Sequence, residues 1–203
     1  MKDGLEFTIL FTNDLHSEFE TMPRIRSLFR TYERERPGRL LRFDIGDHMD
    51  RMRLETEGTM GAANIDIMNA TGYDAVVPGN NEGLTMTAET LDRLYGTQAA
   101  FPVLAANLVR RSRGASGAVE RVPWLKPRLT IRRGGVTFGV FGLTAAFNDF
   151  YRELGWEALD PFEAAEEQVR RLREEGADVI IALSHLGLSH DRQLAESVSG
   201  VDL

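Results

Sequence analysis

Short apolar runs alternate along the chain with stretches in which apolar residues recur at helical spacing. This alternation is typical of strands joined by crossover helices in an α/β domain. The apolar runs predict strands over residues 6–12, 40–45, 75–77, 103–106 and 179–183. The helical stretches predict helices over residues 22–36, 61–70, 87–95 and 161–175.

Two of these helices carry detailed sequence signals. In residues 22–36, Ile25, Leu28, Phe29 and Tyr32 are spaced to form one buried face. The clearest signal for the start of a helix is Asp-Pro-Phe-Glu, beginning at residue 160. It has a capping carboxylate, a proline at the first helical position and a glutamate three residues after the cap. That helix is expected to end at a glycine, residue 176.

Two further segments are interpreted from their turn residues. Residues 129–143 contain two β-rich runs around Gly134-Gly135, which suits a tight hairpin turn, so we expect an antiparallel hairpin to join the sheet. Residues 109–122 mix Arg110, Arg111 and Arg113 with Gly and Ser. We expect a solvated loop there; the alternative is a phosphate-attracting patch, but no aromatic side chains are interleaved with the charges.

Composition narrows the class of protein. With 203 residues, of which 42% are hydrophobic, the chain can bury one sizeable core, so we treat residues 1–203 as one domain. The net charge of -7 argues against nucleic acid or an anionic membrane as the main partner. No cysteine is present, so a metal would be held by oxygen and imidazole. The start of the sequence has no signal-peptide pattern, and we expect a cytoplasmic protein unless a signal peptide has been removed.

Metal-type side chains follow directly on four of the predicted strands: Asp14, His16, Asp47, Asn80 and His185. In an open α/β sheet the carboxyl ends of the strands border one crevice, so residues at four such ends can converge. Each position has a plainer interpretation when taken alone, a structural histidine for His16 and His185 and a simple turn for Asn80. The four together predict a metal site.

Local spacing supports that prediction. Asp14-Leu15-His16 in near-extended chain would turn a carboxylate and an imidazole to one side, with Leu15 facing away. A glycine stands directly before Asp47 and another before Asn80, where sharp turns would place the ligands at the strand ends. Asp47 is the natural bridging ligand between two ions.

These segments, Thr-Asn-Asp-Leu-His from residue 12, Gly-Asp from 46, Gly-Asn-Asn-Glu from 79 and Ser-His from 184, resemble in order the first four blocks of the calcineurin-like phosphoesterases. The first block resembles the branch of 5'-nucleotidases and 2',3'-cyclic phosphodiesterases. The resemblance implies an α-β-β-α layered sandwich. It also implies two divalent ions, of Mn, Mg, Zn, Fe or Co, and hydrolysis of a small phosphorylated substrate such as a nucleotide, as in nucleotide catabolism.

By the same resemblance, Asp14, His16 and Asp47 would hold one ion, and Asp47, Asn80 and His185 the other. A hydroxide bridging two such ions is a strong nucleophile toward phosphorus at neutral pH. The metal ions, rather than the charge of the chain, would attract the phosphate.

Two departures from the family pattern change the expectation. The family's last ligand block, of Gly-x-His-x-His type, and its C-terminal substrate domain would follow residue 203, so we expect a truncated domain that is inactive or very weak alone. Asn81 and Leu84 stand where the nucleotidase branch has a catalytic His and Asp. The alternative function is a metal-binding fold that serves as a non-catalytic binding or regulatory module.

Overall fold

The computed structural model describes residues 5–111 and 118–203. Within them, strands form a five-stranded sheet in the order β1-β2-β3-β4-β7 and two three-stranded sheets, β11-β9-β8 and β10-β5-β6. The strands are β1 (Thr8–Thr12), β2 (Leu40–Asp44), β3 (Ala75–Val76), β4 (Val103–Leu104), β5 (Leu108–Arg111), β6 (Val119–Glu120), β7 (Leu125–Lys126), β8 (Arg128–Arg133), β9 (Val136–Thr144), β10 (Trp156–Ala158) and β11 (Val179–His185).

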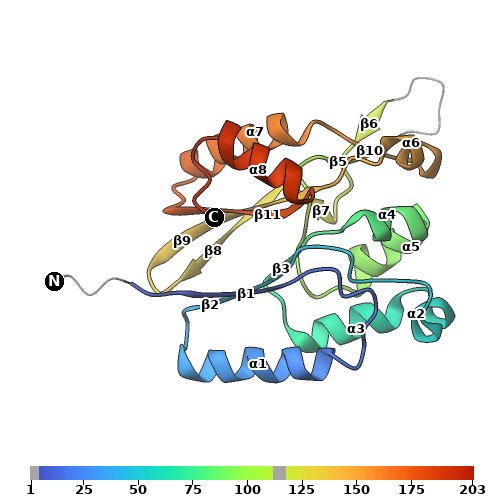
Figure 1. Ribbon diagram of the computed structural model, residues 1–203, viewed down its shortest axis with the longest axis horizontal. Helices are drawn as coiled ribbons and strands as arrows, with labels where there is room; N and C mark the ends of the chain where they lie inside the picture. Colours follow the sequence, from blue (N-terminus) through green and yellow to red (C-terminus); the bar gives the residue numbers. More distant parts are fainter. Residues whose placement is uncertain (1–4, 112–117) are drawn as a thin grey trace.

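Helices cover the outer faces of the five-stranded sheet and of the sheet of β8, β9 and β11. Figure 1 shows α1 and α3 below the five-stranded sheet and α7 and α8 above the sheet of β8, β9 and β11. The helices are α1 (Met22–Glu35), α2 (Leu54–Thr59), α3 (Ala62–Thr71), α4 (Asn80–Thr85), α5 (Ala88–Arg93), α6 (Asn148–Tyr151), α7 (Pro161–Glu174) and α8 (Leu188–Ser197). A π-helical turn, Leu94–Gln98, continues α5, and a 3-10 turn, Arg152–Leu154, follows α6.

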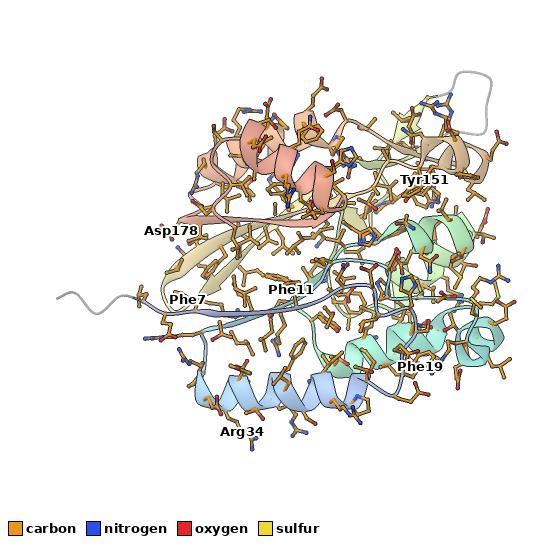
Figure 2. All side chains as sticks on the ribbon, in the orientation of Figure 1. Phe7, Phe11, Phe19, Arg34, Tyr151 and Asp178 are labelled. Atoms are coloured by element: carbon orange, nitrogen blue, oxygen red, sulfur yellow. The ribbon has the colours of Figure 1, made fainter. Side chains whose placement is uncertain are left out.

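The buried side chains form three clusters that match these layers. Side chains fill the space between the five-stranded sheet and the sheet of β8, β9 and β11 (Figure 2). There Phe7 packs edge-on against Phe138, at 5.0 Å between ring centroids. Along β9, Val140 faces this inner cluster and Phe141 faces the cluster under α7 and α8. Strands buried on both faces read as continuous apolar runs, which explains the pattern of the sequence. The α-β-β-α sandwich is confirmed.

Most of the elements predicted from hydrophobic periodicity are present. All five predicted strands exist, and all four predicted helices lie within a few residues of their expected bounds. Asp160 caps α7 by accepting hydrogen bonds from the backbone N–H groups of Phe162 and Glu163, as predicted. The hairpin is also confirmed, because Arg133 pairs with Val136 across Gly134 and Gly135, whose φ values are both positive.

Three expectations about these elements were wrong. The hairpin does not join the five-stranded parallel sheet but forms a second sheet with β11. The reason is that both faces of this second sheet are apolar: one packs against α7 and α8, and the other packs against the five-stranded sheet. Residues 109–122 are not simply a solvated loop, since β5 and β6 occupy its described ends. Leu28 is 48% exposed, because Met22, Ile25 and Phe29 on α1 face the sheet and Leu28 lies to one side of them.

Two arginines of that segment, Arg110 and Arg111, are engaged in ion pairs rather than in a phosphate-attracting patch. The guanidinium of Arg110 binds Asp92 at 2.8 Å and stacks over Trp156, and Arg111 binds Glu157 at 2.6 Å. Arg113 lies outside the described residues. Among the helices of residues 5–111 and 118–203, none is long and apolar enough to cross a membrane.

Candidate metal centre

The loops that follow β1 and β2 run side by side and carry three of the predicted ligands. Backbone N–H groups of Asp14 and His16 donate to the carbonyl groups of Gly46 and Asp47, at 3.0 and 2.9 Å. Asp14, His16 and Asp47 all adopt left-handed backbone conformations, with φ values of 53°, 44° and 53°. The expectation of a near-extended chain at residues 14–16 was therefore wrong. Turns with positive φ bring these side chains together, and strained backbone conformations of this kind cluster at functional sites.

Glycine is required at two points of close approach. A Cβ atom on Gly79 would lie 2.1 Å from Oδ1 of Asp47, and one on Gly46 would lie 2.6 Å from Nδ1 of His185. Gly46 also has a φ of 118°, a backbone conformation that residues with a side chain rarely adopt. The glycines before Asp47 and Asn80 therefore let three loops meet.

The two carboxylate oxygens of Asp47 face two different histidines. On one side, Nε2 of His16 lies 3.8 Å from Oδ2 of Asp47 and 3.7 Å from Oδ1 of Asp14. On the other side, Nε2 of His185 lies 3.5 Å from Oδ1 of Asp47 and 3.3 Å from Oδ1 of Asn80. The structure thus brings all five predicted residues together, and ligand atoms of Asp14, Asp47 and His185 also lie within 4.8 Å of one another, so the two sets overlap.

His185 reaches the site from the second sheet, at the last position of β11. Its Nδ1 lies 2.9 Å from the backbone carbonyl oxygen of Ile45, which can accept a hydrogen bond from a protonated Nδ1. The tautomer with hydrogen on Nδ1 leaves the lone pair of Nε2 directed at Asn80 and Asp47. An imidazole held in this way is oriented as a metal ligand.

Charge interactions at the site shift two pKa values. Burial alone would raise the pKa of Asp47, but a hydrogen bond from His185, when no metal is bound and Nε2 carries a proton, and one from the backbone of Asn81 outweigh it and hold that pKa below its usual range. Burial alone would lower the pKa of His185, but the Asp47 carboxylate stabilises the protonated imidazole more strongly, so the pKa of His185 is raised. Asp47 is therefore ionised at neutral pH, as a metal ligand must be.

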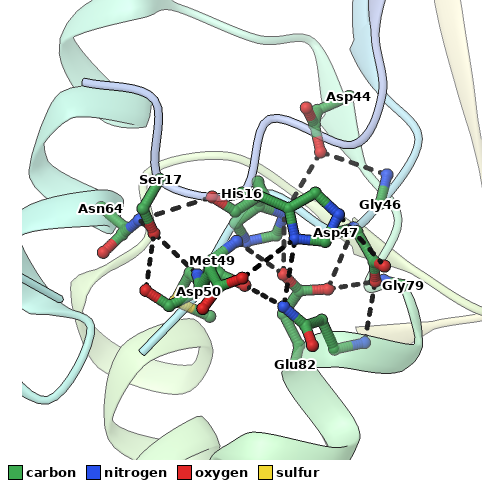
Figure 3. Close-up of polar contacts among 12 residues, drawn as sticks. His16, Ser17, Asp44, Gly46, Asp47, Met49, Asp50, Asn64, Gly79 and Glu82 are labelled. Carbon is green, nitrogen blue, oxygen red and sulfur yellow. Dashed lines mark hydrogen bonds and ion pairs between the residues drawn. The ribbon is translucent and has the colours of Figure 1, made fainter. Parts of the chain in front are cut away.

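His16 has a second partner that the sequence analysis did not identify. Its Nδ1 lies 3.4 Å from a carboxylate oxygen of Asp50 (Figure 3), whereas its Nε2 faces Asp14 and Asp47. The side-chain nitrogen of Asn81 donates to the carbonyl oxygen of Met49 at 2.7 Å and lies 3.3 Å from the same Nδ1. Asp50 and Asn81 therefore both contact Nδ1 of His16 and help to orient its ring.

A buried carboxylate, Glu82, fixes the backbone around the proposed ligands. It accepts hydrogen bonds from the N–H groups of Asp47 (3.2 Å), Met49 (2.8 Å) and Gly79 (2.7 Å), which joins the loop after β2 to the start of α4 (Figure 3). Burial raises the pKa of Glu82, although the nearby His48 acts in the opposite direction.

His48 lies beneath the site in contact with two buried carboxylates. Its Nδ1 is 3.2 Å from Asp44 and 3.7 Å from Glu82, and Nε2 is 2.7 Å from the hydroxyl of Tyr95. Burial disfavours the imidazolium, but Glu82 and Asp44 outweigh burial and raise the pKa of His48 to about 9. The spacing of Asp44 and His48, four residues apart across a turn, carries no recognisable pattern, so the sequence offered no signal for this ion pair.

The donor set fits hard or borderline divalent ions. One ligand atom from each of Asp14, Asp47 and His185 lies within 4.8 Å of the others, close enough to share an ion after small side-chain movements. Carboxylate, amide and imidazole donors suit Mg, Mn, Fe and Zn, and two carboxylates offset part of the charge of the ions. Asp14 remains half exposed, which leaves the site open to solvent and to a substrate.

Comparison with known proteins decides the family. The model of the family described as calcineurin-like phosphoesterase matches residues 7–202. The chain belongs to this family. Metallophosphoesterases of this family imply divalent metal ions, and a possible three-residue site, Asp14, Asp47 and His185, is present in the described part of the chain.

Individual relatives agree with this assignment. The chain is 36% identical over its whole length to the metallophosphoesterase YunD of Bacillus subtilis, of which it covers 43%, and 30% identical to a snake venom 5'-nucleotidase of Gloydius brevicauda, of which it covers 36%. A 5'-nucleotidase precursor from Thermus thermophilus superimposes with a TM-score of 0.80 and 27% identity, over 96% of this chain and 40% of that one. The chain therefore spans less than half the length of these relatives.

Proposed function

We propose that this chain hydrolyses phosphate esters by means of two divalent metal ions, and that its substrates are nucleotides or related phosphomonoesters and phosphodiesters. The observation that carries the proposal is the position of Asp47: its Oδ2 faces His16, which also contacts Asp14, and its Oδ1 faces His185, which also contacts Asn80. One carboxylate placed between two donor groups is the arrangement that a bridging ligand requires.

In this proposal Asp14, His16 and Asp47 hold one ion, and Asp47, Asn80 and His185 hold the other. The bound ions would supply an activated hydroxide and stabilise the charge that develops on the phosphoryl oxygens. The chain's own residues orient this centre: Ile45 fixes the tautomer of His185, and Glu82 holds the backbone of Asp47 and Gly79.

Asn81 occupies the position at which the resemblance places a catalytic histidine. Its amide binds the carbonyl oxygen of Met49, and an amide cannot transfer a proton to a leaving group at neutral pH. We expect this chain to favour esters with good leaving groups. Because it covers less than half of its relatives' length, we expect its turnover alone to be weak.

The test uses the chain stripped of metal with a chelator and then titrated with Mn²⁺, Mg²⁺ or Zn²⁺. Calorimetry should show two ions per chain, and hydrolysis of p-nitrophenyl phosphate and of a nucleoside monophosphate should appear only after reconstitution. Asp47→Ala should remove both metal binding and hydrolysis. Turnover that survives chelation, or survives Asp47→Ala, would contradict the proposal. Binding of two ions without any turnover would favour the alternative, a non-catalytic metal-binding module.

A further inference from the structure

A cavity of about 330 Å³ lies at the opposite end of the parallel strands from the candidate metal centre. It borders the amino ends of β3 and β4, where Asp74 and Pro102 stand directly before these strands. Asp47 and Asn80, by contrast, follow the carboxyl ends of β2 and β3, which run parallel to each other. The other side of the cavity is formed by β7 and by β8, the edge strand of the second sheet. The cavity is therefore separate from the metal centre.

Cations outnumber carboxylates around this cavity, although the chain as a whole carries a net charge of -7. Lys126, Arg132 and Arg133 line it, and Asp74 is the one carboxylate among its described lining residues. These four residues are here called the basic pocket. A concave positive site on a negatively charged protein concentrates anions at one place rather than over the surface in general.

Asp74 is saturated by two arginines and so does not cancel the charge of the basic pocket. Its Oδ2 accepts hydrogen bonds from the backbone N–H and from Nε of Arg42, at 2.9 and 3.2 Å. Its Oδ1 accepts from Arg42 at 3.2 Å and from Arg133 at 2.9 Å. The side chain of Asp74 is 9% exposed, whereas that of Arg133 is 34% exposed. One carboxylate thus holds two guanidinium groups in fixed positions and leaves a surplus positive charge, and such preorganisation lowers the entropic cost of binding an anion.

The other two cations of the basic pocket are available to a ligand. Lys126 and Arg132 are exposed, and neither has a carboxylate partner within residues 5–111 and 118–203. Arg132 donates from Nε to the hydroxyl of Thr137 at 3.4 Å, a long hydrogen bond that leaves its terminal nitrogens for other acceptors. Thr130 adds a further hydroxyl to the lining.

The size of the cavity limits the kind of anion. Small-molecule sites span ~300–1,000 Å³, so this cavity suits a compact group. Nucleic acid would require a longer track of cations than one lysine and two arginines. Lysine and arginine bind phosphoryl oxygens through charge-assisted hydrogen bonds, which are stronger than those between neutral groups.

We propose that the basic pocket is a second, metal-independent site, which binds a compact phosphoryl anion with at least two negative charges. Free phosphate or pyrophosphate and the phosphate group of a small phosphorylated molecule share this chemistry. The site requires neither the metal ions nor the hydrolysis of the proposed function, so the two proposals can fail separately.

The test is a two-dimensional NMR titration of the metal-free chain with pyrophosphate. Amide signals of Asp74 and of residues 130–133 should shift, and Lys126→Ala and Arg132→Ala should each weaken binding about three- to fivefold. Both variants leave the partners of Asp74 in place, and thermal melts establish that they are folded. Arg192→Ala is the matched control, because Arg192 is an exposed arginine of α8 that does not line the cavity, and it should bind like the unmodified chain.

Further probes identify the source of the phosphoryl group. Tighter binding of ribose 5-phosphate than of inorganic phosphate would assign the pocket to a phosphorylated small molecule, and tighter binding of inorganic phosphate or pyrophosphate would assign it to the free anion. Absence of pyrophosphate binding, equal losses in Arg192→Ala and the pocket variants, or shifts confined to residues 14–16 and 46–49 would overturn the proposal. Tighter binding of hexaglutamate or of phosphatidylserine vesicles than of any phosphate probe would also overturn it, in favour of a protein or a membrane partner.

Discussion

Nδ1 of His16 lies 3.4 Å from a carboxylate oxygen of Asp50. This contact keeps the opposite nitrogen of the ring directed at Asp14 and Asp47. We expect Asp50→Ala to weaken divalent-metal binding by about 10- to 100-fold, because the ring loses the group that orients it. Calorimetric titration with Mn²⁺ measures the change.

Two controls sharpen this prediction. Asp50→Asn keeps an oxygen that can accept from Nδ1 and should restore most of the affinity. Glu33→Ala, at an exposed position of α1, should bind like the unmodified chain. If Asp50→Ala binds metal as tightly as Glu33→Ala, Asp50 does not position His16.

Substitution of Gly79 should disrupt the centre by steric conflict. Gly79→Ala would place a methyl group 2.1 Å from Oδ1 of Asp47, and we expect a loss of about 1–3 kcal/mol of unfolding free energy together with weaker metal binding. Gly58→Ala is the matched control, because no atom would meet its methyl group and it lies within α2. Urea unfolding of both variants tests the difference, and equal stabilities would contradict the proposed close approach.

The two donor groups around Asp47 predict different metal stoichiometries. Asp47→Ala removes an oxygen from both groups, so we expect neither ion to bind tightly. Asn80→Ala removes an oxygen from the His185 group alone, so we expect one ion to remain. Metal content after dialysis provides the measurement. Two ions retained by Asp47→Ala would exclude a bridging role.

The buried His48 predicts a pH-dependent stability. The pKa of His48 is about 9 in the folded chain and about 6.5 in the unfolded chain. Its contribution to the free energy of unfolding is therefore complete below about pH 6.5 and is lost as the pH rises through about 9. We expect the unfolding free energy of the metal-free chain to fall by up to about 1.4 kcal/mol per pH unit in that window. Urea unfolding followed by tryptophan fluorescence measures it, and His48→Gln should flatten the profile. An equally steep decline in that variant would assign the effect to another group.

Asn81→His should restore part of the proton chemistry that the resemblance assigns to this position. We expect kcat/KM of the variant to rise for a nucleoside monophosphate, because its leaving alkoxide needs a proton, and to rise little for p-nitrophenyl phosphate. Leu84 is left unchanged, because it packs partly buried against the core and an aspartate there would be destabilising. The ratio of kcat/KM for the two substrates is the measurement; an unchanged ratio would show that Asn81 is not the relevant departure.

The sequence predicted the strands, the long helices and the five clustered side chains because these depend on local signals: apolar periodicity, capping residues and glycine before a ligand. It did not predict short strands such as Val119–Glu120. A strand of two residues is too short for its hydrophobic pattern to differ from that of a loop. It also missed the parts of the site that depend on long-range contacts. Glu82 meets the Asp47 backbone across 35 positions of sequence, and His48 meets Tyr95 across 47. No local pattern encodes such pairs.

His185 is the one proposed ligand that belongs to the second sheet, whereas Asp14, His16, Asp47 and Asn80 follow strands of the first. An ion shared by His185 and Asp47 would act as a cross-link between two layers that are otherwise joined largely by apolar packing. Apolar faces tolerate slight sliding, whereas a coordinated ion tolerates very little. Metal loading should therefore couple the two halves of the sandwich mechanically. Amide hydrogen exchange in β9 and β11 should slow on metal addition, although neither strand's interior touches the ions.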